Sequence, residues 1–250
     1  MDELNRRRYL DAMGISLWQR RDLEFAPIPE SSGEVDGRAA GPVGTEVETA
    51  EQPPLSSGND TVEQMDWPLL RDAVRNCQSC ELRAGCTQTV FGVGSTEADL
   101  LVIGEAPGAD EDRQGEPFVG RAGQLLNAML LAMGYKRESV FIANIVKCRP
   151  PNNRDPKPEE ALSCEPYLKR QIELIQPRLI LAVGRIAAQN LLRTDITVGK
   201  LRGRLHHLGD RQIPLVVTYH PAYLLRSPEQ KAKSWQDLQL ALSTLRSAEV

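Results

Sequence analysis

The amino-acid sequence predicts an α/β fold with three layers, in which helices cover both faces of a central, mainly parallel four-stranded sheet. Two observations support this prediction. Strand-like and helix-like segments alternate from residue 66 onward, and the helix-like segments carry apolar residues on one face. Parallel strands need a long crossover connection, usually a helix, so this alternation is typical of a parallel sheet between two helix layers.

Each element of this fold is visible as a separate sequence pattern. Apolar, β-rich runs predict strands at residues 99–104, 139–146, 178–183 and 213–219. Amphipathic segments predict helices at residues 121–133, 158–176, 185–192 and 229–245. Pro177 ends the second helix, because proline has no backbone N–H and cannot continue a helix. We therefore place the folded domain at residues 64–250.

Two segments of different composition precede this domain. Residues 26–63 contain five prolines together with Ser, Gly and Glu, and almost no large apolar side chains. We expect a disordered acidic linker there, because such a stretch cannot bury enough surface to offset its conformational entropy. Residues 1–25 contain a short amphipathic peptide with Tyr, Leu, Met, Ile and Trp side chains at 9–18. This peptide either folds back onto the domain or docks into a groove of a partner.

Charge is unevenly distributed along the chain, whose net charge is −4. Residues 30–63 contain eight acidic residues and one basic residue, and residues 1–29 contain five of each sign, so residues 64–250 carry +3. The domain is mildly basic, and a nucleic-acid partner is not excluded. There is no apolar run of about 18 residues and no secretion-signal core, so we expect a cytoplasmic protein without a membrane span.

The five cysteines indicate metal ligation rather than disulfides, because their number is odd and a secretion signal is absent. Cys77 and Cys80 form a Cys-x-x-Cys pair, and Cys148 and Cys164 are separated by 15 residues. Four thiolates of this kind can hold a tetrahedral zinc ion or an iron–sulfur cluster. A zinc ribbon usually has a second Cys-x-x-Cys pair, which this chain lacks. Cys86 is left without a ligand role.

Polar groups follow three of the predicted strands, where the site of an open parallel sheet is expected. The segments concerned are residues 104–112, 144–148 and 220–225. Glu105 directly follows the first strand in a glycine-flanked turn, whereas a solvated turn is the favoured interpretation of the acids at 110–112. Phe118, in a glycine-rich loop, is either a stacking platform or a core anchor. His220, after the last strand, is either structural or catalytic.

Four motifs in this order resemble the family-4 uracil-DNA glycosylases. They are Gly104-Glu105-Ala106-Pro107-Gly108, the segment Glu116-Pro117-Phe118-Val119-Gly120-Arg121-Ala122-Gly123, the run from Asn144 to Arg154, and His220-Pro221-Ala222-Tyr223-Leu224-Leu225. The resemblance extends from about residue 66 to the C-terminus. It implies an enzyme that hydrolyses the N-glycosidic bond of uracil in DNA and so starts base excision repair. It also implies a [4Fe–4S] cluster held by four cysteines, which match Cys77, Cys80, Cys148 and Cys164.

The resemblance also implies roles for individual residues. Phe118 would stack on a uracil flipped out of the duplex, and Asn144 would read its edge by donating to O4 and accepting from N3–H. Glu105 would orient water or stabilise the positive sugar, with Glu111 as a second residue for that charge. His220 would donate to uracil O2 as negative charge builds there.

Further residues would line the pocket or contact DNA. The backbone at Ala106 and Pro107 would line the pocket. One of two leucines would fill the gap left by the flipped base, Leu224 or Leu225. Three basic side chains would contact phosphates, which positions DNA without reading its sequence: Lys147, Arg149 and Arg154.

The N-terminal peptide has a resemblance of its own. Residues 10–21 resemble the N-terminal segment of the psi subunit of the bacterial replicative clamp loader, so the loader is a possible partner for residues 9–21. Psi has a degenerate glycosylase-like fold, and the alternative function is therefore a non-enzymatic replisome adaptor. The enzyme is favoured because a mere scaffold does not need the proposed catalytic residues and four cysteines together.

Overall fold

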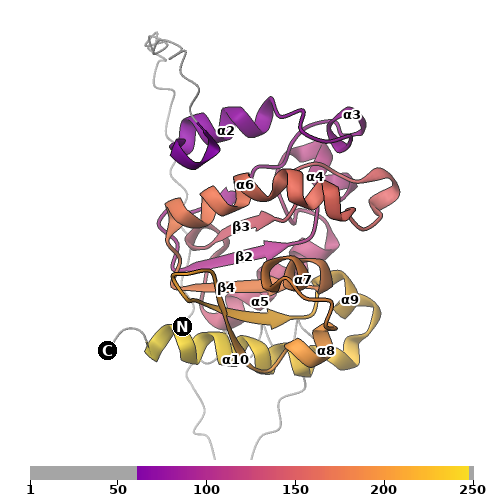
Figure 1. Ribbon diagram of the computed structural model, residues 1–250. Coiled ribbons are helices and arrows are strands. Elements are labelled where there is room, and N and C mark those ends of the chain that lie inside the picture. The colour runs from indigo at the N-terminus through magenta and orange to yellow at the C-terminus, as the bar shows by residue number, and fades with distance from the viewer. Residues whose placement is uncertain (1–60, 248–250) are drawn as a thin grey trace, which may run out of the picture. The chain divides into compact units, whose positions relative to one another are not determined.

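The computed structural model describes residues 61–247 and shows a six-stranded sheet between two layers of helices (Figure 1). The strands lie in the order β1-β3-β2-β4-β6-β5, and the central four are parallel. Their bounds are β1 Val93–Gly94, β2 Leu100–Gly104, β3 Phe141–Asn144, β4 Leu179–Val183, β5 Leu205–Leu208 and β6 Ile213–Thr218.

The prediction of four strands is wrong in number, because two short strands extend the sheet. The predicted strands are the four parallel ones, β2, β3, β4 and β6. Strand β1 pairs antiparallel with β3 and has only two residues, too few for any periodicity. Strand β5 pairs antiparallel with β6 through a Leu-His-His-Leu sequence that is not an apolar run. Edge strands of this kind leave little signal in a sequence.

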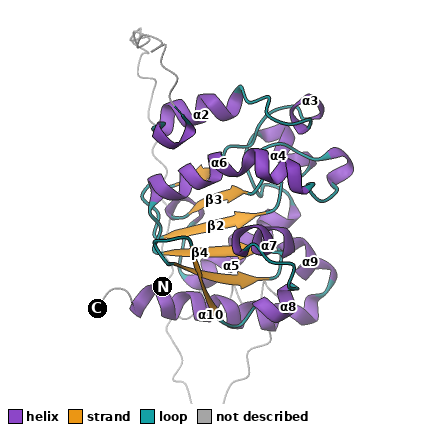
Figure 2. Cartoon of the chain, in the orientation of Figure 1, coloured by secondary structure: helices purple, strands orange, loops and turns teal. Residues whose placement is uncertain are grey.

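The helices lie on both faces of the sheet (Figure 2). Their bounds are α2 Trp67–Arg75, α3 Leu82–Gly85, α4 Ala109–Gln114, α5 Arg121–Met133, α6 Pro158–Ile175, α7 Arg185–Leu192, α8 Val198–Leu201, α9 Pro221–Arg226 and α10 Lys231–Ser247. Single 3-10 turns are η1 Val62–Gln64, η2 Arg137–Ser139, η3 Pro151–Asn153 and η4 Pro228–Gln230. Helices α5 and α7 have the predicted bounds, whereas α2, α3, α4, α8 and α9 were not predicted.

Helix α2 shows how a short helix is specified locally. The Asp66 side chain accepts a hydrogen bond from the Leu69 N–H at 3.1 Å, and Pro68 occupies the first turn, where its missing N–H has no cost. Leu70 and Val74, one turn apart, are the buried residues of this helix. Through these two side chains, α2 packs against the hydrophobic core.

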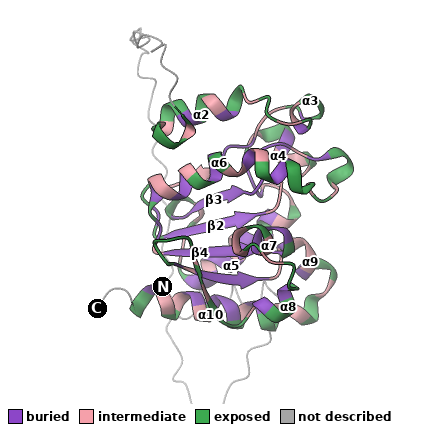
Figure 3. Ribbon diagram, viewed as in Figure 1, coloured by how far each residue is buried: buried purple, intermediate pink, exposed green. Residues whose placement is uncertain are grey.

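Two hydrophobic cores lie on opposite faces of the sheet, and the four parallel strands between them are almost entirely buried (Figure 3). Strand β2 contributes alternately to both, because successive side chains of a strand point to opposite faces. Leu101 and Ile103 belong to the core covered by α2, α6 and α7. Leu100 and Val102 belong to the core covered by α5 and α10. Helices therefore cover both faces of the central sheet, and the ends of the strands are the part of the sheet that is left for a site.

The strand register aligns the carboxyl ends of the parallel strands. Gly104 of β2 pairs with Asn144 of β3, and Val183 of β4 pairs with Thr218 of β6. The residues that follow these pairs must leave the sheet at the same level. All sequence segments predicted to carry the site therefore converge at one edge.

The docking peptide expected at residues 1–25, and the expected linker up to residue 60, lie outside the described residues. Residues 62–64, at the end of that linker segment, form η1, and Val62 packs partly buried against the core. Within residues 61–247, no helix has both the length and the apolar character needed to cross a membrane.

Candidate functional site

A cleft of about 740 Å³ opens at the carboxyl ends of the central strands. This volume is in the range of pockets that hold small organic ligands. Its walls come from the segments after β2, β3, β4 and β6, together with the loop that carries Phe118. The residues of the predicted site that line it are Glu105, Ala106, Pro107, Glu111, Phe118, Asn144, Arg154 and His220.

The deepest part of the cleft is formed by an amide and an aromatic ring. Asn144 is 2% exposed, and its Oδ1 has no hydrogen-bond partner within the described chain. A Cβ atom at Gly104 would lie 2.5 Å from this Oδ1 and 2.5 Å from Cζ of Phe118, so only glycine fits between them. A buried amide oxygen without a partner costs free energy, which a ligand with an N–H donor would recover.

Phe118 is both anchored in the core and exposed to the cleft, so the two sequence interpretations apply together. Its ring is 6% exposed and packs with the core under α5, and it also lines the cleft. Its backbone has φ of +54°, and its carbonyl accepts a hydrogen bond from the Arg137 guanidinium at 3.4 Å. A Cβ at Gly123 would lie 1.7 Å from the same carbonyl oxygen. The loop therefore holds the ring in one position.

His220 faces Phe118 across the cleft, with ring centroids 5.6 Å apart and an interplanar angle of 30°. It is the N-cap of α9, and its Nδ1 accepts a hydrogen bond from the Ala222 N–H at 3.1 Å. In a neutral ring the proton must then be on Nε2. Burial, together with the nearby Arg226 cation, lowers the pKa of His220 to about 4 against the opposing effect of Glu111. At neutral pH, His220 is thus an uncharged Nε2–H donor.

Glu105 lies at the end of β2 in a group of charged side chains that the sequence did not reveal. Burial and the neighbouring Asp155 carboxylate raise the pKa of Glu105 to about 7, against the opposing effect of Arg185. Arg185 in turn forms an ion pair with Asp155, and both line the cleft. The rule that sites follow strand ends also applies to β4, and it would have identified Arg185, which begins α7 directly after that strand.

Glu111 is fully engaged by backbone groups. Its Oε1 accepts from the N–H groups of Val119 and Gly120 at 2.9 and 3.1 Å, and its Oε2 accepts from Gly108 at 3.1 Å. The neighbouring Asp112 accepts from the backbone and hydroxyl of Thr87. The acids at 110–112 are thus in the first turn of α4, where Asp110 remains solvated at the surface and Glu111 and Asp112 are engaged by the chain. Glu111 ties the β2 turn to the loop that precedes α5.

Two of the predicted DNA contacts are wrong. Lys147 is 2% exposed, and its ammonium donates to Asn144 O at 3.0 Å and to Gln171 Oε1 at 2.7 Å, so it does not reach a phosphate. Leu224 has no exposed surface and belongs to the core under α5 and α10, so it does not enter DNA. Leu225, the next residue on α9, is 37% exposed. Leu225 is therefore the one of the two leucines for which insertion into DNA remains a prediction.

The two arginines of the predicted phosphate contact are at the surface, but both have partners in the chain. Arg149 Nε donates to Asn153 Oδ1 at 2.7 Å. Arg154 forms a bidentate pair with Glu160 at 2.6 and 2.8 Å, and its side chain remains 36% exposed at the rim of the cleft. Phosphate contacts by Arg149 and Arg154 stay predictions.

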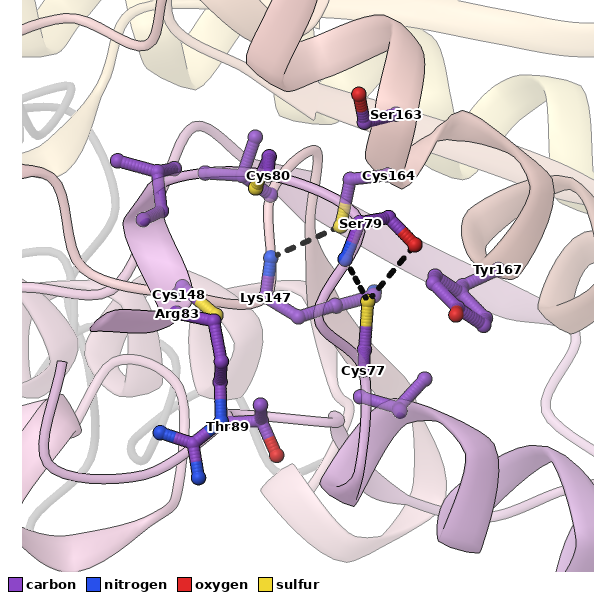
Figure 4. Close-up of a pocket in the computed structure, with 13 residues that line it drawn as sticks. Cys77, Ser79, Cys80, Arg83, Thr89, Lys147, Cys148, Ser163, Cys164 and Tyr167 are labelled. Atoms are coloured by element: carbon purple, nitrogen blue, oxygen red, sulfur yellow. Dashed lines mark hydrogen bonds between the residues drawn. The ribbon is translucent and has the colours of Figure 1, made fainter. Parts of the chain in front are cut away.

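A second cavity, beside the cleft, brings together four cysteines that are far apart in the sequence (Figure 4). Cys77 follows α2, Cys80 precedes α3, Cys148 follows β3, and Cys164 belongs to α6. Within residues 61–247, no three His, Cys, Asp or Glu side chains form a group that could hold a metal ion. The four thiols instead line a narrow shared space of about 10 Å³. Cys86 is buried and contacts the Cys148 thiol, but it does not line this space.

Hydrogen-bond donors point to two of these sulfur atoms. The Lys147 backbone N–H donates to Cys164 Sγ at 3.3 Å, and the Ser79 N–H donates to Cys77 Sγ at 3.5 Å, as Figure 4 shows. Such donors stabilise negative charge on sulfur and are typical of the surroundings of thiolate-bound metals. These donors oppose burial, which raises the pKa of the Cys148 and Cys164 thiols, while the pKa of Cys77 is lowered.

Comparison with known proteins agrees with this geometry. The family model described as the uracil DNA glycosylase superfamily matches residues 91–239. A type-4 uracil-DNA glycosylase of Archaeoglobus fulgidus is 44% identical over 177 residues, covering 67% of this chain and 89% of the relative. One of Pyrobaculum aerophilum is 42% identical over 180 residues, covering 70% and 92%. A type-5 uracil-DNA glycosylase of Thermus thermophilus is 37% identical over 118 residues, covering 41% and 53%.

The type-4 relatives thus match most of their own length at more than 40% identity, whereas the type-5 match covers about half of that relative. These similarities agree with the four sequence motifs and with the cleft that those motifs build. The chain belongs to the uracil-DNA glycosylase superfamily and, within it, to the type-4 uracil-DNA glycosylases.

Proposed function

We propose that this chain is a uracil-DNA glycosylase that hydrolyses the bond between uracil and deoxyribose and thereby starts base excision repair. The observation that carries the proposal is the buried, unpartnered Oδ1 of Asn144 beside the ring of Phe118. A uracil extruded from DNA presents a flat face for the ring and an N3–H donor for the oxygen. Membership in the type-4 family supports the same function.

Selection of uracil against cytosine follows from the Asn144 amide. Oδ1 accepts from uracil N3–H, and Nδ2 donates to uracil O4. Cytosine has an acceptor at N3 and an amino donor in place of O4, so both pairings fail in this orientation of the amide. The mismatch leaves buried polar groups unpaired, and sites of this design discriminate by roughly 10⁴- to 10⁵-fold.

Bond cleavage uses the two groups on either side of the glycosidic bond. The C1′–N1 bonding electrons move onto the uracil ring, and His220 Nε2–H donates to O2, where negative charge accumulates. The ionised Glu105 stabilises the positive charge on C1′ and orients water. The water adds its hydroxyl to C1′ and gives its proton to Glu105, and the uracil anion then takes a proton from solvent.

Four thiolates supplied by Cys77, Cys80, Cys148 and Cys164 would hold the [4Fe–4S] cluster. A cluster spaces its ligands more widely than a single metal ion does, which suits thiols that surround a shared cavity. When bound, the cluster supplies a cross-link between separate parts of the chain. The cysteines connect the loop between α2 and α3 to helix α6 and to the segment after β3. That segment directly follows Asn144, the last residue of β3.

The DNA around the extruded base would be held by side chains near the rim. Leu225 is exposed on α9, the helix that His220 caps, and is the residue proposed to fill the gap in the stack. Arg149 and Arg154 would supply phosphate contacts next to the segment of Asn144. Such contacts position DNA without specifying its sequence.

Incubation with uracil-containing oligonucleotides, single- and double-stranded, followed by alkaline cleavage of abasic sites, tests the function. We expect strand scission at uracil and none in matched oligonucleotides with cytosine or thymine at that position. No scission by iron-loaded protein would reject the enzyme and favour the adaptor function.

We also propose that residues 9–21 dock the enzyme to the replicative clamp loader, supported only by their resemblance to the psi peptide. A tether of this kind raises the local concentration of enzyme at new DNA. A peptide of residues 1–30 should capture the loader, and a Trp18→Ala peptide should capture less. Equal capture by both peptides would reject docking through this segment.

A further inference from the structure

We propose that Lys147 is a positioning residue that balances the charge of the thiolate-bound cluster and holds the uracil-reading Asn144 from behind. The inference rests on the proposed cluster and goes beyond it, because it assigns a function to a residue that was predicted to contact DNA. It connects the cysteine cavity to the uracil pocket through one side chain.

The first argument is the set of contacts of the Lys147 side chain. Its Nζ donates to the backbone carbonyl of Asn144 at 3.0 Å and to Gln171 Oε1 at 2.7 Å. Gln171 is itself fixed, because its Nε2 donates to Phe91 O at 2.9 Å and so turns its oxygen toward the ammonium. The ammonium therefore fixes the residue whose side chain forms the floor of the uracil pocket.

The second argument is the charge of this side chain. A buried ammonium is costly unless an opposite charge compensates it. Among the described residues, no carboxylate forms an ion pair with Lys147, which is 2% exposed and lines the same cavity as the four cysteines. Four thiolates on a [4Fe–4S] core give the complex a net negative charge. The cluster is the counter-charge that this lysine needs.

The third argument is the position of Lys147 between the two sites. The segment 144–148 begins at Asn144, which reads uracil, and ends at Cys148, which would bind iron. Lys147 contacts a residue of each site, since its backbone N–H donates to Cys164 Sγ and its side chain donates to Asn144 O. Loss of the cluster would leave the ammonium uncompensated and would disturb the carbonyl that it holds.

A Lys147→Met variant tests the charge balance, because methionine keeps much of the chain length and removes the charge. In the iron-loaded protein, we expect the reduction potential of the cluster to become more negative, since a nearby cation is lost. In protein stripped of iron by a chelator, we expect Lys147→Met to unfold at higher denaturant concentration than wild type. In loaded protein, we expect the variant to unfold at a lower concentration than wild type.

The control is Lys136→Met, which removes an exposed lysine that precedes η2 and should change neither measurement. An unchanged potential in Lys147→Met would overturn the inference, as would the same order of stability with and without iron. If neither wild type nor Lys147→Met folds without iron, the reduction potential of the cluster in the loaded proteins alone tests the inference.

Inhibition by free uracil tests the connection to the pocket. Lys147→Met should raise the inhibition constant of uracil several-fold, while Lys136→Met should leave it unchanged. An equal constant in Lys147→Met and wild type would contradict the link to Asn144. Wild-type protein that lacks iron would contradict the cluster itself, and iron-loaded protein that does not excise uracil would contradict only the proposed enzyme, so the three failures are distinguishable.

Discussion

The uracil cleft and the cysteine cavity meet at one short segment, residues 144–148, and in both of them burial favours the uncharged form of the ionisable groups. In the cleft, the pKa of His220 falls to about 4 and that of Glu105 rises to about 7. In the cavity, the pKa of Lys147 falls to about 8 and that of Cys164 rises to about 11. The difference is that the proposed cluster would give the cavity a counter-charge, whereas the cleft keeps its groups neutral or nearly so.

The comparison implies that variants of each region change different properties. Cleft variants should change the excision rate and leave iron content unaltered. Cavity variants should change iron content and stability first. The predictions below test that separation.

The largest expected effect is the loss of excision rate when the hydrogen-bond donor to the leaving uracil is removed. His220→Ala removes the Nε2–H donor to uracil O2 and should lower kcat roughly 100- to 1000-fold, as the loss of one such donor does elsewhere. Single-turnover excision measures it, with iron content as the control. A loss below tenfold would show that His220 is structural, and a loss of iron would show that the two regions are not separate.

The pH dependence of excision is the next largest effect. Because the pKa of Glu105 is about 7, its carboxylate forms as pH rises through 7, and kcat/KM should rise with it. At pH 5 the rate should be roughly 100-fold lower than at pH 8, since about one molecule in a hundred is then ionised. His220 stays neutral over this range.

Variants identify the group behind this profile. Glu105→Gln should give a low rate that no longer depends on pH between 5 and 8. Asp155→Asn removes the neighbouring carboxylate and should move the midpoint to lower pH. A midpoint near 7 that persists in Glu105→Gln would assign the titration to another group.

The cysteine cavity gives the third prediction. Cys164→Ser should abolish most iron binding, because Cys164 lines the cavity with the other three ligands. Cys86→Ser is the comparison variant, since Cys86 contacts the Cys148 thiol but does not line the cavity, and it should retain iron. Iron analysis and the visible absorbance of the purified variants measure this. Loss of iron in Cys86→Ser would mean that the ligand set is different.

The two leucines of α9 give the smallest effect on excision. Leu224→Ala removes a fully buried side chain and should cost about 2–5 kcal/mol of stability, with little change in excision by the folded protein. Leu225→Ala should leave the unfolding midpoint unchanged and lower excision from double-stranded DNA only. The opposite pattern would show that Leu224 is the residue that enters DNA.

The long elements of the fold could be predicted from sequence, because their patterns are strong. The four parallel strands and helices α5 and α7 were found through apolar runs and helical periodicity. Strand β1, with two residues, and helix α4, with six, are too short for such patterns. Such short elements depend on contacts made in the folded state. In α4, Glu111 accepts hydrogen bonds from the backbone N–H groups of Val119 and Gly120.

The candidate site was predictable where chemistry follows directly after a strand. Glu105, Asn144 and His220 were found by that rule, and the cleft gathers them. The burial of Lys147 was not predictable, because a lysine next to an arginine-rich stretch suggests a surface. Asp155 was also missed, since only the fold brings it beside Glu105.

The most direct test of the account is single-turnover excision of uracil by wild type and Asn144→Ala, with iron content measured in both. We predict that wild type excises uracil and not cytosine, and that Asn144→Ala loses roughly 100-fold of its uracil activity while keeping its iron, as expected when two buried hydrogen bonds are lost. Equal rates for the two proteins would contradict the claim that Asn144 reads the base.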